Sequence, residues 1–376
     1  MRVLLAPDSF GGTMSAVEAA EAVAGGWLRS RPGDSLTVAP MSDGGPGFID
    51  VIAASTQGRR IPVRVPDPLG RPVDARVFLA GDTGYVESAE ACGLALLTTE
   101  ERDPLVGTSY GVGVLLMAAV EAGARRLVVG LGGSATNDCG AGMLAAIGVS
   151  VLDGAGSVLP YGGGPLASAA RVTGAARLRD AALVAASDVD NPLVGPHGAS
   201  AVFGPQKGAD RAGVGLLDAA LARFAGVLER DLAGCPAGLS LLPGGGAAGG
   251  LGAALLALGA GRASGVGLVS DLVALDEAVG GADLVVTGEG PFDGQSLRGK
   301  VVAGVALAAA ARGVPCVVLA GQVAVGRPQA TAAGVTAAYA VAEHAGSLAA
   351  SMADPAGRLA DLAAHVAAHV AAGRGR

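Results

Sequence analysis

Five acidic and glycine-rich segments of this sequence contain most of the side chains that could do chemistry. Carboxylates are common ligands of Mg²⁺, and backbone N–H groups of glycine-rich loops bind phosphate. Phosphoryl transfer needs both, together with a carboxylate that orients or deprotonates the acceptor hydroxyl. Phosphoryl transfer is therefore the chemistry that these segments favour. They are residues 8–13, 42–45, 132–138, 187–192 and 288–293.

The carboxylates of these segments are candidates for cation binding and for acid–base chemistry. Residues 132–136 could form a phosphate cradle. Each segment alone is equally consistent with ordinary turns and helix caps, because Asp, Asn, Ser and Gly are common there. Five such segments in equivalent positions favour a shared site. The candidate carboxylates are Asp43, Asp188, Asp190, Glu289 and Asp293.

Lysine is rare in this chain, since Lys207 and Lys300 are the only lysines among 26 basic residues. A compact ammonium group suits phosphate binding, although chance placement is the alternative. Residues 294–300 have the GxxxxGK spacing of a P-loop, but Val301 stands where that motif has Ser or Thr. We therefore do not predict a P-loop, while a lysine at a helix start could still meet phosphate.

Each acidic segment follows a short apolar run that the pattern predicts to be a buried parallel strand. Helical segments at residues 16–29, 112–122 and 300–312 alternate with these runs. This alternation predicts an α/β fold with a parallel sheet, and ligands bind at the carboxyl ends of the strands in such sheets. The predicted strands are residues 3–6, 36–39, 127–130, 183–186, 284–287 and 316–320.

Residues 60–87 interrupt this alternation with two predicted hairpins, which indicate a different sheet. We therefore expect two domains, one inserted in the other. Residues 1–60 and 278–376 would form a Rossmann-like parallel-sheet domain. Residues 61–277 would form an inserted α/β domain with a mixed sheet.

The composition excludes several classes of protein. A net charge of −7 and the absence of a basic run argue against nucleic-acid binding. The mean hydropathy is +0.51, but the apolar stretches are too short or too interrupted for a bilayer span, and no signal peptide is expected. Four scattered cysteines predict a reduced, cytoplasmic chain. Neither the GxGxxG match at residues 244–249 nor the pair His365 and His369 is a convincing site.

Seven motifs in order resemble the bacterial glycerate kinase family, and the resemblance covers nearly the whole chain. It implies an enzyme of two α/β domains that transfers the γ-phosphoryl group of ATP, with Mg²⁺, to glycerate. The product that the resemblance implies is 2-phosphoglycerate. The motifs are residues 6–10, 40–45, 68–72, 132–138, 188–193, 203–209 and 287–290, the last with Asp293, Gln295, Gly299 and Lys300.

Roles can then be assigned to the candidate residues as a hypothesis. The catalytic set is Asp43, Asp188 and Lys300, in which Asp188 or Asp43 acts on the acceptor hydroxyl. The metal ligands are Asp190, Glu289 and Asp293. Glycerate is bound by Asp8, Ser9, Arg71 and Arg298. Nucleotide phosphates are bound by Gly132, Gly133, Ser134, Thr136, Asn137 and Lys207.

Three positions depart from the family pattern. Gly11, Pro46 and Pro291 stand where the family usually has Lys, Glu and Arg. The carboxylate of glycerate needs a cationic or amide partner, which Arg71 or Arg298 could supply. Two alternatives remain open: a kinase for a related hydroxy-acid, and a ligand-binding or sensor protein without kinase activity. A nicotinamide-dependent oxidoreductase is a weaker third.

Overall fold

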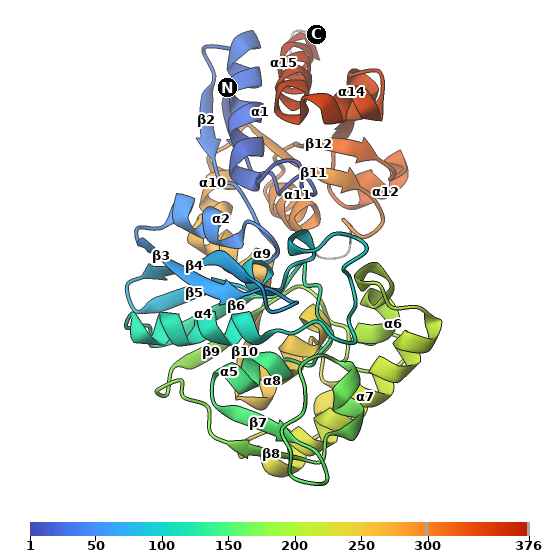
Figure 1. Ribbon diagram of the computed structural model, residues 1–376. Coiled ribbons are helices and arrows are strands. Elements are labelled where there is room, and N and C mark those ends of the chain that lie inside the picture. Colours follow the sequence, from blue (N-terminus) through green and yellow to red (C-terminus); the bar gives the residue numbers. More distant parts are fainter. Residues whose placement is uncertain (298–299, 374–376) are drawn as a thin grey trace. The chain divides into compact units, whose positions relative to one another are not determined.

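The first unit of the fold is built on five parallel strands. They are β1 (Arg2–Leu5), β2 (Ser35–Val38), β11 (Leu284–Phe292), β12 (Cys316–Val323) and β13 (Ala337–Ala340). Their order in the sheet is β13-β12-β11-β1-β2. Figure 1 labels β2, β11 and β12 of this sheet. The computed structural model describes residues 1–297 and 300–373. The predicted α/β class is confirmed, with a strand at each predicted position in this part of the chain.

The chain order of this sheet reverses between β1 and β11. From β1 the chain continues to β2 on one side, and from β11 it continues through β12 to β13 on the other. In open α/β sheets, ligands bind outside the carboxyl ends of the strands at such a switch point. Asp8 follows β1 and Glu289 lies on β11, so both are at this place.

Two of the predicted strands differ from those observed. β2 is mostly exposed rather than buried because it is the edge strand of the sheet. β11 extends to Phe292 instead of ending at Thr287, because residues 288–292 continue the parallel ladder with β12. A Cβ on Gly288 would lie 2.0 Å from the carbonyl oxygen of Leu319, so glycine permits this close pairing.

Helices α1 (Ala16–Ser30) and α15 (Pro355–Gly373) pack side by side and share an apolar core with the sheet (Figure 1). A capping box begins α1, in which Ser15 accepts from the N–H of Glu18 and Glu18 accepts from that of Ser15. Trp27 of α1 is fully buried in this core. The other helices of the unit are α9 (Gly265–Leu272), α10 (Leu275–Gly280), α11 (Val301–Ala311), α12 (Arg327–Ala332), α13 (Val341–His344) and α14 (Leu348–Ala353).

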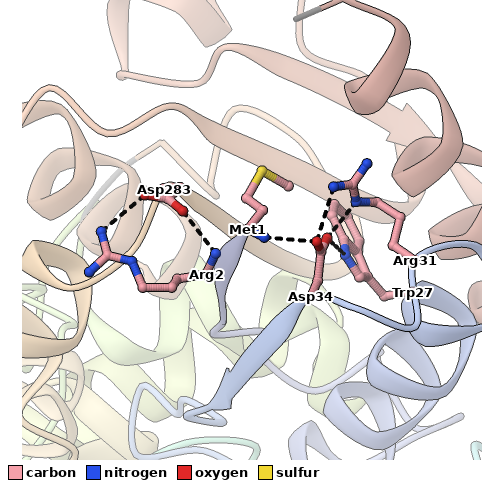
Figure 2. A network of polar contacts seen from close by, with 6 residues as sticks. All are labelled: Met1, Arg2, Trp27, Arg31, Asp34 and Asp283. Carbon is pink, nitrogen blue, oxygen red and sulfur yellow. Dashed lines mark hydrogen bonds and ion pairs between the residues drawn. The ribbon is translucent and has the colours of Figure 1, made fainter.

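A buried ion-pair network holds the start of β1 against the end of α1 (Figure 2). The carboxylate of Asp34 accepts from the amino group of Met1 at 2.9 Å and from the indole N–H of Trp27 at 3.0 Å. It also accepts two bonds from the guanidinium of Arg31, at 2.5 and 3.0 Å. Chiefly through Arg31, these donors hold the pKa of Asp34 well below its usual range.

The second unit contains a mixed six-stranded sheet in the order β10-β9-β6-β5-β4-β3. β3 to β5 are antiparallel, as the two predicted hairpins indicate, and β5, β6, β9 and β10 are parallel. The strands are β3 (Arg59–Pro66), β4 (Pro72–Ala80), β5 (Thr83–Glu87), β6 (Arg126–Gly130), β9 (Ala182–Ala186) and β10 (Gly261–Ala263).

A large apolar core joins this sheet to its helices. Asp210 caps the longest helix, α7, by accepting from the N–H of Gly213. A two-stranded ribbon of β7 (Val149–Leu152) and β8 (Arg171–Gly174) completes the unit. The helices are α3 (Ala89–Cys92), α4 (Tyr110–Glu121), α5 (Ala141–Ala146), α6 (Ala199–Phe203), α7 (Arg211–Asp231) and α8 (Leu251–Ala257).

The chain passes between the two units more often than a simple insertion would require. The first unit comprises residues 1–43, 50–56 and 266–376, and the second comprises residues 44–49 and 57–265. The sequence-based boundaries were residues 60/61 and 277/278. The short segment 44–49 opens helix α2 (Phe48–Ser55), whose remainder belongs to the first unit.

Candidate active site

Three carboxylates of the first unit influence one another at the carboxyl ends of its central strands. Burial raises the pKa of Asp8 to about 8, with the charges of Asp43 and Glu289 acting in the same direction. The N–H of Ser9, 2.7 Å from Oδ1 of Asp8, and the charge of Lys300 oppose this rise. The first unit therefore brings together Asp8, Asp43, Glu289 and Lys300, four of the predicted site residues.

Glu289 is the most deeply buried member of this cluster. Its side chain is only 7% exposed, and within the described residues its Oε1 has no hydrogen-bond partner. Burial raises the pKa of Glu289 to about 7, and a hydrogen bond from Ser296 and the charge of Lys300 oppose the rise. A buried carboxylate oxygen without a partner is costly, so a bound cation or donor would stabilise it.

The residues around Glu289 fit a Mg²⁺ ion that is shared with substrate. Within residues 1–297 and 300–373, His, Cys, Asp and Glu side chains form no group of three or more that could hold a metal by themselves. Mg²⁺ usually takes one or two carboxylates and completes its shell with water and substrate phosphates. The unpartnered oxygen of Glu289 meets that requirement. Asp293 uses its Oδ1 to accept from the N–H groups of Gln295 and Ser296, at 2.7 and 3.4 Å.

The raised pKa of Asp8 predicts how stability depends on pH. Between its ordinary value of 3.8 and about 8, the folded protein holds a proton that the unfolded chain has lost. The contribution of Asp8 to stability is therefore fully present below pH 3.8, decreases as the pH rises, and is lost once the pH has passed about 8. We expect the melting temperature, measured by calorimetry without Mg²⁺ from pH 5 to 9, to fall less steeply in Asp8→Asn than in the unaltered protein. Equal slopes would contradict the assignment.

Lys300 precedes helix α11 as its N-cap residue. The Lys300 ammonium lowers the pKa of both Asp8 and Glu289, which places its charge near the cluster. The N-terminus of a helix also favours anions. This position suits phosphate. Arg298, predicted to bind glycerate, lies outside the described residues.

In the second unit, the glycines of two predicted loops come into direct contact with each other and with the end of β9. A Cβ on Gly132 would lie 2.5 Å from the Cα of Gly45, and one on Gly44 would lie 2.8 Å from the carbonyl oxygen of Ala186. Gly44 also has a φ of +92°, which L side chains rarely adopt. Glycine is therefore required where the loop after β6 and the last residue of β9 meet residues 44–46. The prediction that all five acidic segments form one site stays a prediction.

The buried side chain of Lys207 stabilises the glycine-rich loop of residues 132–137 through hydrogen bonds. Its side chain is fully buried, and its ammonium donates to Oγ of Ser134 at 3.0 Å and to the carbonyl of Thr136 at 2.7 Å. Burial lowers the pKa of Lys207 to about 8. Two of its three N–H donors are thus used by the loop. Lys207 also lines a cavity of about 100 Å³ together with Gly132, Gly133 and Ser134.

Asn137 and Asp138, at the end of this loop, are buried and bond to other groups of the protein. Asn137 is fully buried and donates to Oγ of Ser200 at 2.9 Å, while within the described chain its Oδ1 has no partner. Asp138 accepts from Ser109 and from the N–H groups of Gly140 and Gly142, so it fixes the start of α5. Ala248, which borders the cavity, has a φ of +50°. Such strain in an L-residue costs about 1–2 kcal/mol and is typical of functional sites.

Three further residues of the predicted site, Asp188, Asp190 and Arg71, lie in the second unit and bond to neighbouring protein groups. Ser264 donates to Oδ1 of Asp188 at 2.5 Å. Asp190 has a side chain that is 82% exposed and pairs with Arg262. Arg71 binds Asp67 at 2.7 Å, Glu101 at 2.6 Å and the carbonyl of Leu96 at 3.2 Å, so its guanidinium fixes a turn. We therefore leave Arg71 out of the proposed site.

Glu87 is a buried carboxylate that the sequence analysis did not select. It ends β5 and accepts from the N–H groups of Gly47 and Ile49, at 3.0 and 3.3 Å. Burial and the charge of Glu90 raise the pKa of Glu87 to about 7. Its position at the end of a predicted strand was the available signal. Glu87 fixes the glycine segment that follows Asp43.

A parallel sheet with an acidic cluster at its switch point, and a second sheet with a lysine-supported glycine loop, define an α/β enzyme suited to phosphoryl transfer. A family model described as the glycerate kinase family matches residues 3–371. The chain belongs to the glycerate kinase family. No helix in the described part of the chain has the length and hydrophobicity needed to cross a membrane.

Named relatives are similar in sequence to this chain along most of their lengths. Glycerate kinase of Bacillus subtilis (strain 168) is 44% identical, over 86% of this chain and 85% of the relative. Glycerate 2-kinase of Escherichia coli (strain K12) is 42% identical, over 85% of each chain. A crystal structure of a protein from Salmonella typhimurium LT2, whose description gives glycerate kinase 2 as a provisional assignment, is 38% identical and covers both chains fully, with a TM-score of 0.80.

Proposed function

We propose that this protein transfers the γ-phosphoryl group of ATP to the 2-hydroxyl of glycerate. Membership of the glycerate kinase family and the 42% identity to a glycerate 2-kinase support the reaction. The structural observation that carries the proposal is Glu289, a buried carboxylate with an unpartnered oxygen at the switch point of the sheet.

The residues of the first unit then have distinct roles. Glu289, with Asp293, would hold Mg²⁺, which when bound offsets the negative charge of the transferring phosphoryl group. Lys300 binds phosphate at the start of α11. Asp43 orients the acceptor hydroxyl, and Asp8 and Ser9 bind glycerate. A carboxyl with a pKa near 8, such as that of Asp8, can donate a hydrogen bond to a substrate anion.

In the second unit, the loop of residues 132–137 binds phosphate, and Asp188 is a second candidate for acting on the hydroxyl. Lys207 supports this loop rather than reaching out to solvent, because its side chain is fully buried.

Turnover with D-glycerate, ATP and Mg²⁺ tests the proposal, with ADP release as the measurement. If the product is 2-phosphoglycerate, enolase alone converts it to phosphoenolpyruvate, whereas 3-phosphoglycerate requires a mutase first. Turnover with another hydroxy-acid but not with glycerate would overturn the substrate. Binding of glycerate and ATP without ADP release would instead favour a sensor protein.

Lys207→Met is expected to separate activity from stability. The change keeps the length of the side chain but removes the two hydrogen bonds that hold residues 134–136. We expect kcat/KM for ATP to fall about 100-fold, because a loosened loop no longer positions phosphate. The melting temperature should change by only a few degrees, since the lost bonds are offset by removal of a buried charge.

The matched control is Arg211→Met, which removes an exposed cation at the start of α7. It should leave both kcat/KM and the melting temperature unchanged. An unfolded Lys207→Met, or one with normal kinetics, would contradict the assigned role.

A further inference from the structure

An apolar cavity of about 210 Å³ lies beside the acidic cluster of the first unit. Gly290 and Pro291 of β11 line it, directly after Glu289, and Phe10 lines it two residues after Asp8. Gln322, near the end of β12, contributes a third strand end. The cavity therefore occupies the carboxyl edge of the sheet, where open α/β sheets bind ligands.

The wall of the cavity away from the strands comes from residues far along the chain. Leu348 and Met352 of α14 line it while remaining 49% and 54% exposed. Phe10 and Met14 form its inner surface and belong to the buried core. Aromatic and thioether groups pack favourably on planar rings. The volume is below the 300–1,000 Å³ typical of sites for drug-sized ligands, and it suits one ring system.

The chemistry of the cavity distinguishes between the two substrates of the proposed reaction. Glycerate bears an oxygen on each of its three carbons, so it gains nothing from an apolar wall and would lose hydration there. The purine of ATP is flat and largely apolar on its faces, with polar atoms at its edge. Gln322 and Ser351 line the same cavity. The side chain of Gln322 carries both a donor and an acceptor, and that of Ser351 carries a hydroxyl.

We propose that this cavity binds the adenine ring of ATP, with Phe10, Met14 and Met352 against its faces and Gln322 at its edge. The inference rests on the proposed kinase function and adds the place of the nucleotide base. The ribose and phosphates would then extend from the cavity toward Glu289 and Lys300.

Met352→Glu tests the proposal because it puts a charge on the rim of the cavity at an exposed position where folding is not at risk. Calorimetry would compare ADP with inorganic tripolyphosphate, a probe that has phosphates but no purine. We expect the Kd for ADP to rise at least tenfold and the Kd values for tripolyphosphate and glycerate to stay within twofold. Met352→Leu, which keeps the side chain apolar, should bind ADP as tightly as the unaltered protein.

Leu348→Glu provides a second variant on the same rim, with the same expected pattern. Leu307→Glu is the matched control, since Leu307 is 60% exposed on α11 and does not line the cavity. Equal weakening of ADP and tripolyphosphate, weakening of glycerate alone, or no change would overturn the proposal. These binding measurements need no turnover, so they decide the base site even if glycerate is not phosphorylated.

Discussion

Glu289→Gln is expected to lower kcat about 1,000-fold with D-glycerate, ATP and Mg²⁺ at pH 8. The amide has the shape of the carboxyl group but cannot carry the negative charge that binds the cation. Its melting temperature should stay the same or rise, because Glu289 is a buried carboxylate with an unpartnered oxygen. The measurements are ADP release and calorimetric melting of the same preparation.

The control for this variant is Glu277→Gln, which removes an exposed carboxylate of α10 in the same unit. It should have normal kcat. If Glu289→Gln retained more than a tenth of the normal kcat, Glu289 could not be the principal ligand of the cation.

Asp34→Ala is expected to cost about 3–5 kcal/mol in the free energy of unfolding, the range found when one partner of a buried ion pair is removed. The side chains of Asp34 and Met1 are only 4% and 5% exposed. The substitution leaves that amino group, the Arg31 guanidinium and the Trp27 indole without their shared acceptor (Figure 2). Urea unfolding followed by circular dichroism would measure the loss.

Asp361→Ala is the matched control, because it breaks an ion pair with Arg29 that is exposed on both sides. Its cost should be below about 0.5 kcal/mol. Similar costs for the two substitutions would show that burial of the Asp34 network contributes little.

The strands and hairpins were predictable because their local patterns agree with their final environment. β1 and β6 are short apolar runs buried in their sheets, and β3 to β5 are separated by clear turn residues. β11 was predicted too short because Gly288 and Pro291 suggest the end of a strand. Only the partner strand β12, which accepts this backbone at close range, reveals that pairing continues.

The candidate site was predictable by residue type and less so by environment. Asp8, Asp43 and Glu289 were selected because they follow predicted strands, and Lys300 was selected as a rare lysine at a helix start. The four side chains influence one another in the structure. The lysine count selected Lys207, but its burial beneath the loop depends on tertiary packing. The apolar cavity proposed to bind adenine could not be predicted, because Leu348 and Met352 are brought to the ends of β1 and β11 only by the complete fold.

The segment of residues 44–49 has a consequence for dissecting this protein into fragments. It belongs to the second unit although residues 1–43 and 50–56 belong to the first. A recombinant piece covering residues 57–265 would therefore lack Gly47 and Ile49, the donors to the buried carboxylate of Glu87. It would also lack the glycines that fill the space beside Gly130 and Gly132. A recombinant piece meant to fold by itself should therefore begin at residue 44, which keeps the hexapeptide and brings residues 50–56 of the first unit with it.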